Sequence, residues 1–576
     1  MPRRIPYAVA NYEEIVGEHY FFVDKTAFIR ELEAYKIPVF LRPRRFGKSL
    51  WCSILECYYD LNRRERFEEL FGTTDIGREP TKNRNTCMVM RFDFSIVTLY
   101  NDITKLQSSF DDVCRETFKT FLVHYAAYFK TPIDISKSAT GVLIQILGAV
   151  ERSGAPPIMI IVDEYDNFTN QLLTTRQDEL YRNITTGESF LRTFYKAIKA
   201  GVGARSVARV FITGVLPVTM DDLTSGFNIG QIITLEENTL AMMGFTQEEV
   251  DEYVDDIFAE FGWGVSLRQQ VGEELRIHYN GYRFLPGNPT LYNSTICNYY
   301  LNKLVIGKGS LPRDHIDVNL KVDINWLRRL GGEATGKLVD QLLHEGTLPA
   351  DLTQFSSHFN REKFVDPEFF SLSLFFLGLV SFEDEYSLRF PNLTVKTLFL
   401  EYYNELLSLS VSSGYTDMSR AFLKDHKLGG FFGGYWERYI GQIPAQAFDK
   451  ANENFFRTTF YEICTRYLSG HLSFAIEVNR PSGRSDYEAM GRAGSAFEGT
   501  GYVVEFKHFS VEKARMLGVN NWTEARAEDA EQVKAYARDM RAMYPELFVI
   551  QWAVVYTVSS REFRWVEVEA PSVASQ

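Results

Sequence analysis

The sequence predicts a multidomain α/β protein, and three observations lead to this fold class. The chain has 576 residues, whereas a single domain commonly has roughly 100 to 200, so two to four domains are expected. From about residue 24 to 215, short apolar runs alternate with helical periodicity, which is typical of a largely parallel sheet. After the glycine-rich stretch Gly429 to Gly441, a second α/β pattern begins.

The first domain is expected over residues 1–235, as a parallel sheet with helices on both faces. Its strands are predicted from apolar runs of strand length that alternate with helical patterns. These runs are Ile37 to Leu41, Cys87 to Phe94, Pro157 to Tyr165 and Ala208 to Val215.

The middle of the chain is expected to be mostly helical. Thr246 and Glu249 have the spacing of a capping box, which marks a helix start. We expect a helical lid over residues 236–330 and a helical, winged-helix-like linker over residues 331–445. Within the linker, Leu374 to Asn392 predicts two short strands around an acidic turn, followed by a helix from Thr397 to Leu407.

The last domain is expected over residues 446–576. A helical pattern covers residues 452–468, and a second one runs from Glu524 to Met543. Strands are predicted at Phe474 to Val478, Tyr502 to Phe506 and Phe548 to Tyr556.

Composition and charge exclude several classes of protein. The formal net charge of -13 argues against a chain that coats nucleic acid by its overall charge, although a local basic groove stays open. The six cysteines form no CxxC pair, so neither a zinc module nor a disulfide framework is expected. The N-terminus lacks a signal-peptide pattern, and the apolar run Phe369 to Phe382 is too short for a membrane span. We therefore expect a cytoplasmic protein without a membrane segment, with the nucleus as an alternative in a eukaryote.

A phosphate-binding loop is predicted where the first apolar strand runs into RPRRFGKSL, residues 42–50. A strand, a loop and a helix N-terminus arranged in this order converge backbone N–H groups on phosphate. Lys48 is placed to meet the β and γ phosphates, and the Ser49 hydroxyl to meet magnesium. Arg42 stands where the general pattern GxxxxGK[ST] has glycine, so the turn must be made differently.

Carboxylates at the end of another strand support a nucleotide site. Asp163 ends the run PIMIIVD, and Glu164 follows it. Nucleotide hydrolysis requires a magnesium-shell carboxylate and a group that polarises water, although Asp-Glu is also common at sheet edges. Thr213 either senses the γ-phosphate or packs its methyl group inward. Arg44 and Arg45 either surround the phosphates or are solvated loop residues.

The run of motifs FVDKTAFIREL, RPRRFGKSL, IIVDEYDNF, FITGVLPVTMDDLTSGFNI, GFTQEEV and YNGYRF resembles the AAA-ATPase-like family found with C-terminal PD-(D/E)XK nuclease domains. The likeness covers about residues 5 to 290, and RPRRFGKS is the usual loop in that family. It implies a P-loop NTPase core with ATP and Mg²⁺ as cofactors, Glu164 as the catalytic carboxylate, and Ser49 and Asp163 at the metal. The expected nucleotide-binding residues are Arg44, Arg45, Phe46, Gly47, Lys48, Ser49, Asp163 and Thr213.

A second constellation lies in the C-terminal domain. Asp486 is near the start of one extended segment, and Glu505 and Lys507 lie on the next. Strand alternation puts Glu505 and Lys507 on one face, and hairpin pairing brings Asp486 beside them. Two carboxylates can hold magnesium against a phosphodiester while a lysine orients water. The alternative is a surface strand with alternating charges.

The order GRSD, VEFK and AEDAEQVKAYA is similar to the PD-(D/E)XK nuclease superfamily over about residues 450 to 560. The likeness implies a restriction-endonuclease-like fold with Asp486 and Glu505 as metal ligands and Lys507 as the catalytic lysine. It also implies that Gln532, with Tyr536, lies beside the site. Glu453 and Glu477 match acidic positions that are often seen in that superfamily. The alternative is that either residue is a solvated carboxylate on its helix or strand. The domain has no overall basic surface, so DNA binding needs a local cluster of Arg480, Arg484, Arg492 and Lys507, or another domain. Arg484 is alternatively an ion-pair partner of Asp486.

Together these patterns predict an ATP-binding and ATP-hydrolysing regulator fused to a Mg²⁺-dependent nuclease that acts on nucleic acid, with DNA as the expected substrate. Nucleotide state would then control access to the C-terminal site. The alternative is a nucleotide-switched module that binds nucleic acid or protein without cutting. A homo-oligomer is compatible with either interpretation.

Overall fold

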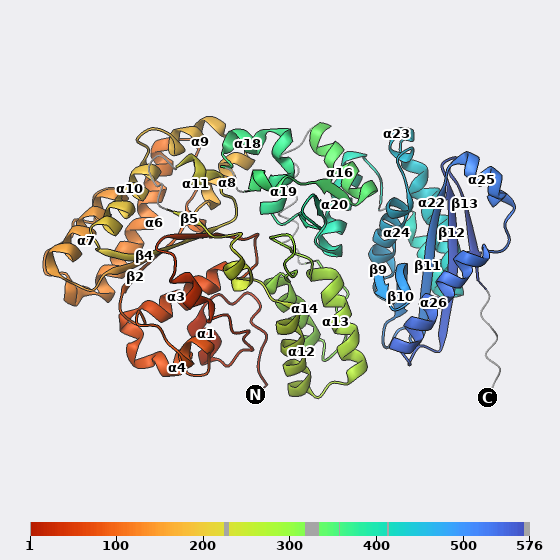
Figure 1. Cartoon of the computed structure of the whole chain (residues 1–576), viewed down its shortest axis with the longest axis horizontal. Helices are drawn as coiled ribbons and strands as arrows, with labels where there is room; N and C mark the ends of the chain where they lie inside the picture. The colour runs from red at the N-terminus through yellow and green to blue at the C-terminus, as the bar shows by residue number, and fades with distance from the viewer. Residues whose placement is uncertain (1, 224–229, 317–332, 356–357, 412–413, 569–576) are drawn as a thin grey trace.

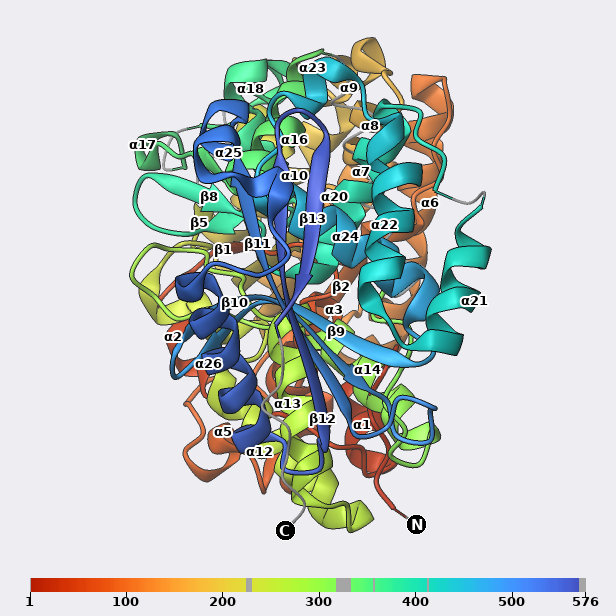
Figure 2. The ribbon, with the colours of Figure 1, turned by 90° about the vertical axis from the view of Figure 1, so that its right-hand side faces the viewer.

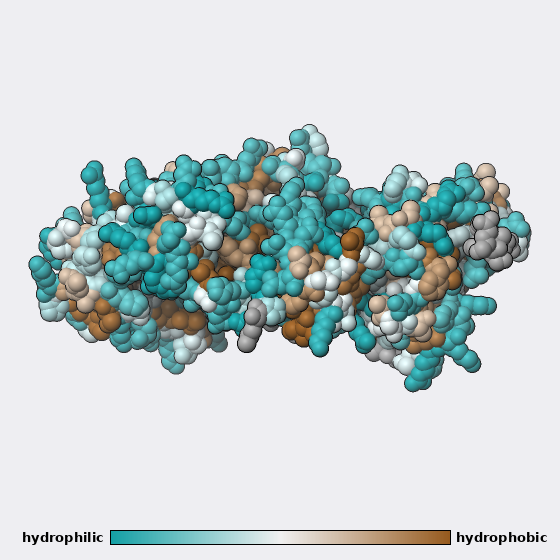
Figure 3. Space-filling view, turned by 90° about the horizontal axis from the view of Figure 1, so that it is seen from below, coloured by the Kyte–Doolittle hydropathy of each residue, from teal (hydrophilic) through white to brown (hydrophobic). Residues whose placement is uncertain are grey.

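The computed structural model describes residues 2–223, 230–316, 333–355, 358–411 and 414–568. The molecule is elongated, with the N-terminal sheet domain at one end and the C-terminal sheet domain at the other (Figure 1). The lid and the linker lie between them. Seen from below, hydrophilic side chains cover most of the surface and apolar residues form scattered patches (Figure 3).

The N-terminal domain is built on a parallel sheet of five strands in the order β2-β3-β4-β1-β5. All four predicted strands are present, and the short β5 adds a fifth. Every residue of β3 is buried, as expected for a central strand covered on both faces. The bounds are β1 Pro38–Leu41, β2 Met88–Asp93, β3 Ile158–Asp163, β4 Val207–Gly214 and β5 Gln231–Ile232.

Helices cover both faces of this sheet, as predicted. Helix α3 (Lys48–Tyr59) packs against β2 and β3, whereas α6 (Ile103–His124) and α10 (Phe190–Gly203) pack against β2 and β4. Helix α7 (Ala139–Ser153) lies on α6 and α10. Aromatic rings such as Phe92 and Phe194 fill the core, with centroids 5.3 Å apart.

The lid consists of α12 (Gln247–Phe261), α13 (Val265–Tyr279) and α14 (Ser294–Ile306). The predicted capping box is present, since the backbone N–H of Thr246 donates to Glu249 and the Thr246 hydroxyl accepts from the Glu249 N–H. The expected lid boundary near residue 330 lies outside the described residues.

The linker contains a small antiparallel sheet in the order β6-β8-β7, from β6 (Thr347–Pro349), β7 (Ser381–Phe382) and β8 (Ser387–Arg389). The two strands predicted within Leu374 to Asn392 are there, but Leu374 to Phe376 end helix α19 (Phe370–Phe376) instead. A short apolar run buried on all sides carries no period that separates helix from strand. Helix α20 (Leu393–Leu406) starts before the expected Thr397, because the Asn392 side chain caps its N-terminus.

The glycine-rich stretch is not a break between domains. Leu428–Arg438 forms α22, which packs on the C-terminal domain. A Cβ atom at Gly429 would lie only 2.7 Å from ring atoms of Trp565, so glycine permits the close approach of this helix. Helix α21 (Tyr415–Asp425) packs on α22.

The C-terminal domain is a mixed sheet in the order β13-β12-β11-β10-β9, in which only β11 and β12 run parallel. Helix α26 lies on one side and α22 and α24 on the other (Figure 2). The structure adds the strands β10 and β13 to the three predicted ones. It also starts the two helices slightly later than expected. The bounds are α24 Glu453–Leu468, β9 Leu472–Arg480, β10 Gly483–Gly491, β11 Thr500–Phe509, α26 Ala527–Met543, β12 Val549–Val558 and β13 Glu562–Glu567.

Two further expectations can be compared with the structure. None of the helices in the described segments is long and apolar enough to cross a bilayer. All six cysteines are buried and carry free thiols.

Candidate functional site

The phosphate loop joins β1 to α3 and is held by the start of α14. Gly47 has φ +87°, in the left-handed region that favours glycine, and it caps α3. Asn293 Nδ2 donates to the carbonyl of Arg44 at 3.2 Å, and the N–H of Thr295 donates to the carbonyl of Arg45 at 3.1 Å. The lid therefore contacts the loop backbone directly.

Lys48 is buried in this loop. Its Nζ lies 3.2 Å from the carbonyls of both Arg42 and Pro43 and 3.4 Å from Oε1 of Glu164. The lysine and the carboxylate after β3 thus face each other across the loop. Glu164 has φ +50°, a conformation that non-glycine residues rarely adopt.

Asp163 offers one oxygen that is available to a cation. Its Oδ2 lies 3.1 Å from Nη2 of Arg91, and the Ser49 side chain also bonds to the carboxylate. The other oxygen, Oδ1, is buried and has no hydrogen-bond partner in the described part of the chain. Burial raises the pKa of Asp163, although Arg91 opposes this shift. A buried carboxylate oxygen without a partner beside a serine hydroxyl fits a magnesium ion.

Arg42 takes a structural role in the position where the general loop has glycine. It is buried, and its guanidinium donates to the carbonyls of Thr234 at 3.0 Å and Leu240 at 2.8 Å. The guanidinium also lies 4.0 Å from the ring centroid of Phe284. Burial lowers the pKa of Arg42 to about 9. Arg42 therefore ties the loop to the lid.

A pocket of about 280 Å³ opens beside the loop. Its walls include residues 45–49 and Glu164, together with apolar side chains of the N-terminal segment and of α3 such as Phe22 and Trp51. A cleft with an apolar wall and a few convergent polar groups is typical of a small-ligand site. Lys25, which sequence reasoning did not select, lines this pocket and pairs with Glu249 at 2.5 Å.

Two of the expected nucleotide-binding side chains are used elsewhere. Thr213 is fully buried and its hydroxyl donates to the carbonyl of Phe40 at 2.7 Å, so it bonds within the sheet. Phe46 is buried and packs edge-on against Tyr282, with ring centroids 5.0 Å apart. Arg44 reaches the lid through its carbonyl.

The structure brings the C-terminal carboxylates and lysine together at one end of the sheet. Lys507 Nζ lies 2.8 Å from Oε1 of Glu505, and the N–H of Phe506 donates to Oδ2 of Asp486 at 2.9 Å. Glu453, at the start of α24, accepts the N–H of His508 at 3.0 Å. The strand pairing expected for Asp486 is thus present.

Glu505 carries the electrostatic signature of a cation site. It is 3% exposed, and burial, with the neighbouring Asp486, raises its pKa to about 7. Its Oε2 is buried and lacks a hydrogen-bond partner among the described residues. Among these residues no three His, Cys, Asp or Glu side chains form a preassembled metal cage. Magnesium, which commonly uses one or two carboxylates and keeps several waters, still fits this pair.

Arg457 of α24, which sequence reasoning missed, holds two carboxylates. It donates from Nη1 to Asp486, and its Nη2 lies 2.5 Å from Oε1 of Glu477. Burial alone would raise the pKa of Glu477, but Lys396, Arg457 and Arg484 lower it to about 2. Glu477 is therefore part of an ion-pair network with these cations.

Gln532 and Tyr536 lie on α26. Val533 of this helix belongs to the same buried apolar cluster as Val503 of β11, which lies on the same face of the strand as Glu505 and Lys507. The helix therefore covers the face of the sheet that carries the site. Gln532 Nε2 donates to the Tyr536 hydroxyl at 3.0 Å rather than to a carboxylate of the cluster.

The basic cluster expected from sequence does not form as a surface. Arg480 is buried against Glu488, and Arg492 is buried and donates to the carbonyls of Leu472 and Leu311, both at 3.2 Å. Arg480 and Arg492 therefore make contacts inside the protein rather than on its surface. Arg484 pairs with Glu477 at 2.5 Å rather than with Asp486, and its side chain is 55% exposed.

Comparison with known proteins identifies both sheet domains. Residues 6–224 match the family described as predicted AAA-ATPase, and residues 451–565 match the PD-(D/E)XK nuclease superfamily. No curated protein matches the chain. One solved structure, the Walker-type ATPase PABY2304 of Pyrococcus abyssi, aligns with 66% of this chain and 97% of its own at 12% identity. The TM-score of 0.36 is too low for that alignment to support an argument.

Proposed function

We propose that this chain, which carries an AAA-ATPase-like domain and a PD-(D/E)XK nuclease superfamily domain, is an ATP-hydrolysing regulator whose C-terminal domain cleaves phosphodiester bonds of nucleic acid, with DNA as the expected substrate. The observation that carries the proposal is the buried Oε2 of Glu505, without a partner in the described chain, next to Lys507 and Asp486. We assign the ATPase core to residues 1–235, the lid to 236–330, the linker to 331–445 and the nuclease to 446–576.

In the nuclease site, Asp486 and Glu505 would hold Mg²⁺, which supplies positive charge next to the reacting phosphate when it is bound. Burial opposes the charge on Lys507, but Glu505 and its other acidic neighbours raise the pKa of the lysine. Lys507 therefore stays protonated, so it can hold the attacking water and offset the charge that develops on the phosphate. Gln532 supports the edge of the site through Tyr536.

In the ATPase site, Lys48 would contact the β and γ phosphates, and Ser49 with Asp163 would hold Mg²⁺. Glu164, 3.4 Å from Lys48, is the carboxylate that would polarise water. The backbone of residues 45–49 supplies N–H groups to the phosphates.

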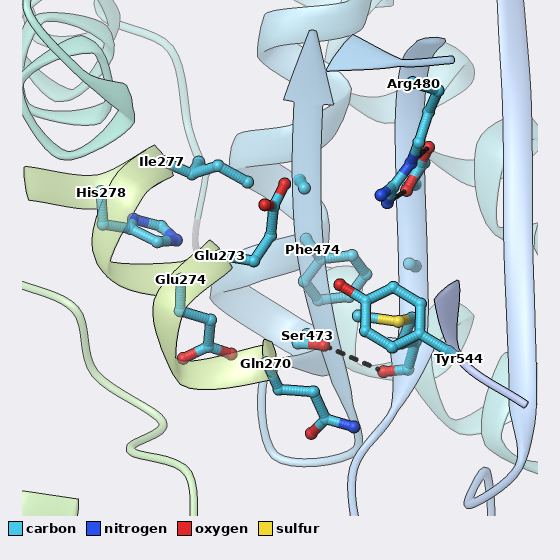
Figure 4. Close-up of a pocket in the computed structure, with 13 residues that line it drawn as sticks. Gln270, Glu273, Glu274, Ile277, His278, Ser473, Phe474, Arg480 and Tyr544 are labelled. Atoms are coloured by element: carbon cyan, nitrogen blue, oxygen red, sulfur yellow. Dashed lines mark hydrogen bonds and ion pairs between the residues drawn. The ribbon is translucent and has the colours of Figure 1, made fainter. Parts of the chain in front are cut away.

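A continuous set of contacts supports control of the nuclease by nucleotide. Thr295 bonds to the phosphate loop, and Tyr300 of the same helix donates to Oε2 of Glu274 on α13 at 2.6 Å. Helix α13 then lies against β9 and β10, where Gln270 and Glu273 face the nuclease strands across a small cavity of about 30 Å³ (Figure 4). Gln270 also bonds to Glu546 at 3.1 Å. A shift of the lid at the loop would therefore reach the nuclease sheet.

A second function, a nucleotide-switched binding module that does not cut, is favoured by the ion pair of Arg457 with Asp486, because a neutralised carboxylate is a poor metal ligand. The test is cleavage of supercoiled plasmid DNA, duplex DNA and RNA by the full chain with Mg²⁺ or Mn²⁺, with and without ATP. We expect cutting that is lost in Asp486→Asn. A parent protein as inert as this variant under every condition contradicts the nuclease and favours the binding module.

A further inference from the structure

A cavity of about 560 Å³ lies where the linker, the lid and the nuclease sheet meet. Cationic side chains from three different parts of the chain line it, and they outnumber the acidic ones. The cationic residues are Arg276, Arg389, Lys396, Arg457 and Arg484, and the acidic ones are Glu345, Glu383 and Glu477.

Glu477 is the point on which several of these cations converge, although Arg389 also pairs with Glu383 and Arg276 pairs with Glu273. Arg457 and Arg484 each lie 2.5 Å from its Oε1, and Lys396 and Arg389 add to the positive field around it. The backbone of Glu477 has φ +58°, a conformation that residues other than glycine rarely adopt. Several guanidinium and ammonium groups around one carboxylate form the environment that a phosphate group also prefers.

Among the cations that line the cavity, Lys396 contacts a neutral partner within the chain rather than a carboxylate. It comes from α20 in the linker, is only 7% exposed, and donates to the amide oxygen of Asn454 at 3.1 Å rather than to a carboxylate. Burial lowers the pKa of Lys396 to about 8. An ammonium group buried against a neutral partner gains from an anionic ligand.

The cavity adjoins the nuclease site. Arg457 lines the cavity with one guanidinium nitrogen on Glu477, and its other nitrogen bonds to Asp486. Asn454, the partner of Lys396, follows Glu453 in α24. A nucleic-acid strand with one phosphate on these cations would bring a neighbouring phosphate to Asp486 and Glu505.

We propose that this cavity binds the sugar-phosphate backbone of the nuclease substrate beside the scissile bond, through Arg389, Lys396 and Arg484, and that Glu477 takes the place of a phosphate in the free protein. The proposal rests on the proposed function, because its ligand is the substrate of that site. It makes the binding surface a joint product of the linker and the nuclease domain.

The test measures binding rather than cutting. The full chain is titrated with labelled duplex DNA, single-stranded DNA and RNA in the presence of EDTA, over a range of salt concentrations. The logarithm of the binding constant falls linearly with the logarithm of the salt concentration. Each lost phosphate contact makes this slope shallower by about 0.9 for a duplex and by about 0.7 for a single strand. We expect this loss in Arg389→Gln and in Lys396→Gln. Arg420→Gln, an exposed arginine of α21 paired with Asp417, is the matched control and should leave the slope unchanged.

Glu477→Gln should have the opposite effect on the affinity for nucleic acid. Removing the internal carboxylate frees the cations for phosphate, so binding should tighten several-fold on the nucleic acid that the cavity accepts, and the three probes identify which one that is. Because Lys396 is buried, its variant is compared with the parent in thermal unfolding, and the half-exposed Arg389 keeps the test decisive if Lys396→Gln fails to fold.

The proposal is overturned if Arg389→Gln binds with the parent slope, or if Glu477→Gln binds more weakly than the parent. These results are separable from the fate of the nuclease. A chain that cuts nucleic acid but shows unchanged slopes contradicts only the cavity, whereas reduced slopes in a chain that cuts nothing contradict only the cleavage.

Discussion

Arg457 donates a hydrogen bond from Nη1 to Oδ1 of Asp486, so the carboxylate expected to bind metal is held by an arginine from the preceding helix. The same guanidinium reaches Glu477. The state of Asp486 thus depends on where Arg457 is engaged.

Arg457→Gln should strengthen metal binding. Loss of the guanidinium removes a positive charge beside Asp486, and the apparent affinity for Mn²⁺ should rise by about tenfold. Isothermal titration calorimetry of the full chain measures this. Arg457→Lys, which keeps the charge, is the control, and an unchanged affinity in the glutamine variant would show that Arg457 does not compete with the metal.

Glu505→Gln and Lys507→Ala should have separable effects on cleavage. The first removes an anionic oxygen from the metal site, so cleavage should fall and be partly restored by raised Mg²⁺ or Mn²⁺. The second should lower the rate by about two to three orders of magnitude without rescue, because charge on the phosphate is no longer offset. A metal titration of initial rates distinguishes the two, and equal rescue of both variants would argue against the roles assigned here.

The raised pKa of Glu505 predicts a pH dependence of stability. An ordinary glutamate has a pKa of 4.5, whereas burial and the neighbouring Asp486 raise the pKa of Glu505 to about 7. The folded state therefore binds a proton more tightly than the unfolded chain, and its contribution to the free energy of unfolding falls as pH rises from 4.5 to about 7. Urea unfolding across this range should show a steeper loss in the parent than in Glu505→Gln, and parallel curves would contradict the shift.

Two variants of the phosphate loop should separate ATP binding from hydrolysis. Lys48→Ala should lose tight ATP binding, because the β and γ phosphates lose their cation. Glu164→Gln should bind ATP and hydrolyse it far more slowly, since only water activation is removed. Nucleotide titration and phosphate release measure the two steps. ATP affinity of the parent level in Lys48→Ala, or parent-level turnover in Glu164→Gln, would move the site elsewhere.

Arg42→Gly places glycine where the general phosphate-loop pattern has it, yet it should destabilise the protein. The change leaves the carbonyls of Thr234 and Leu240 without their donors and opens a cavity beside Phe284, at a cost of roughly 3 kcal/mol. Chemical unfolding measures the difference. A variant as stable as the parent would mean that Arg42 is dispensable for the link between loop and lid.

Local patterns in the sequence predict much of this fold. The buried strands that end in Leu41 and Asp163 are short apolar runs next to turn residues, and the capping box at Thr246 involves residues only three apart. The pairing of Glu505 with Lys507 follows from strand alternation.

What sequence could not provide depends on contacts between distant segments. Arg457 and Lys396 look like ordinary helix-surface cations until the chain folds α20 and α24 against the nuclease strands. The sequence leaves two roles open for Thr213, and only the fold shows that its hydroxyl donates to the carbonyl of Phe40. The glycine-rich stretch that begins at Gly429 precedes the second α/β pattern, but only the fold shows that Gly429 allows its helix to approach Trp565.

Because Lys396 of the linker lines the cavity beside the nuclease site, the chain cannot be cut between the linker and the nuclease without changing that cavity. The matched nuclease segment begins at residue 451, after both Lys396 and helix α22. A fragment cut there would lose a cation at the cavity wall and would expose the aromatic face on which Phe432 meets Phe563 and Trp565. The unit that could be transplanted into another protein, or inherited intact through recombination, is therefore the linker and the nuclease together.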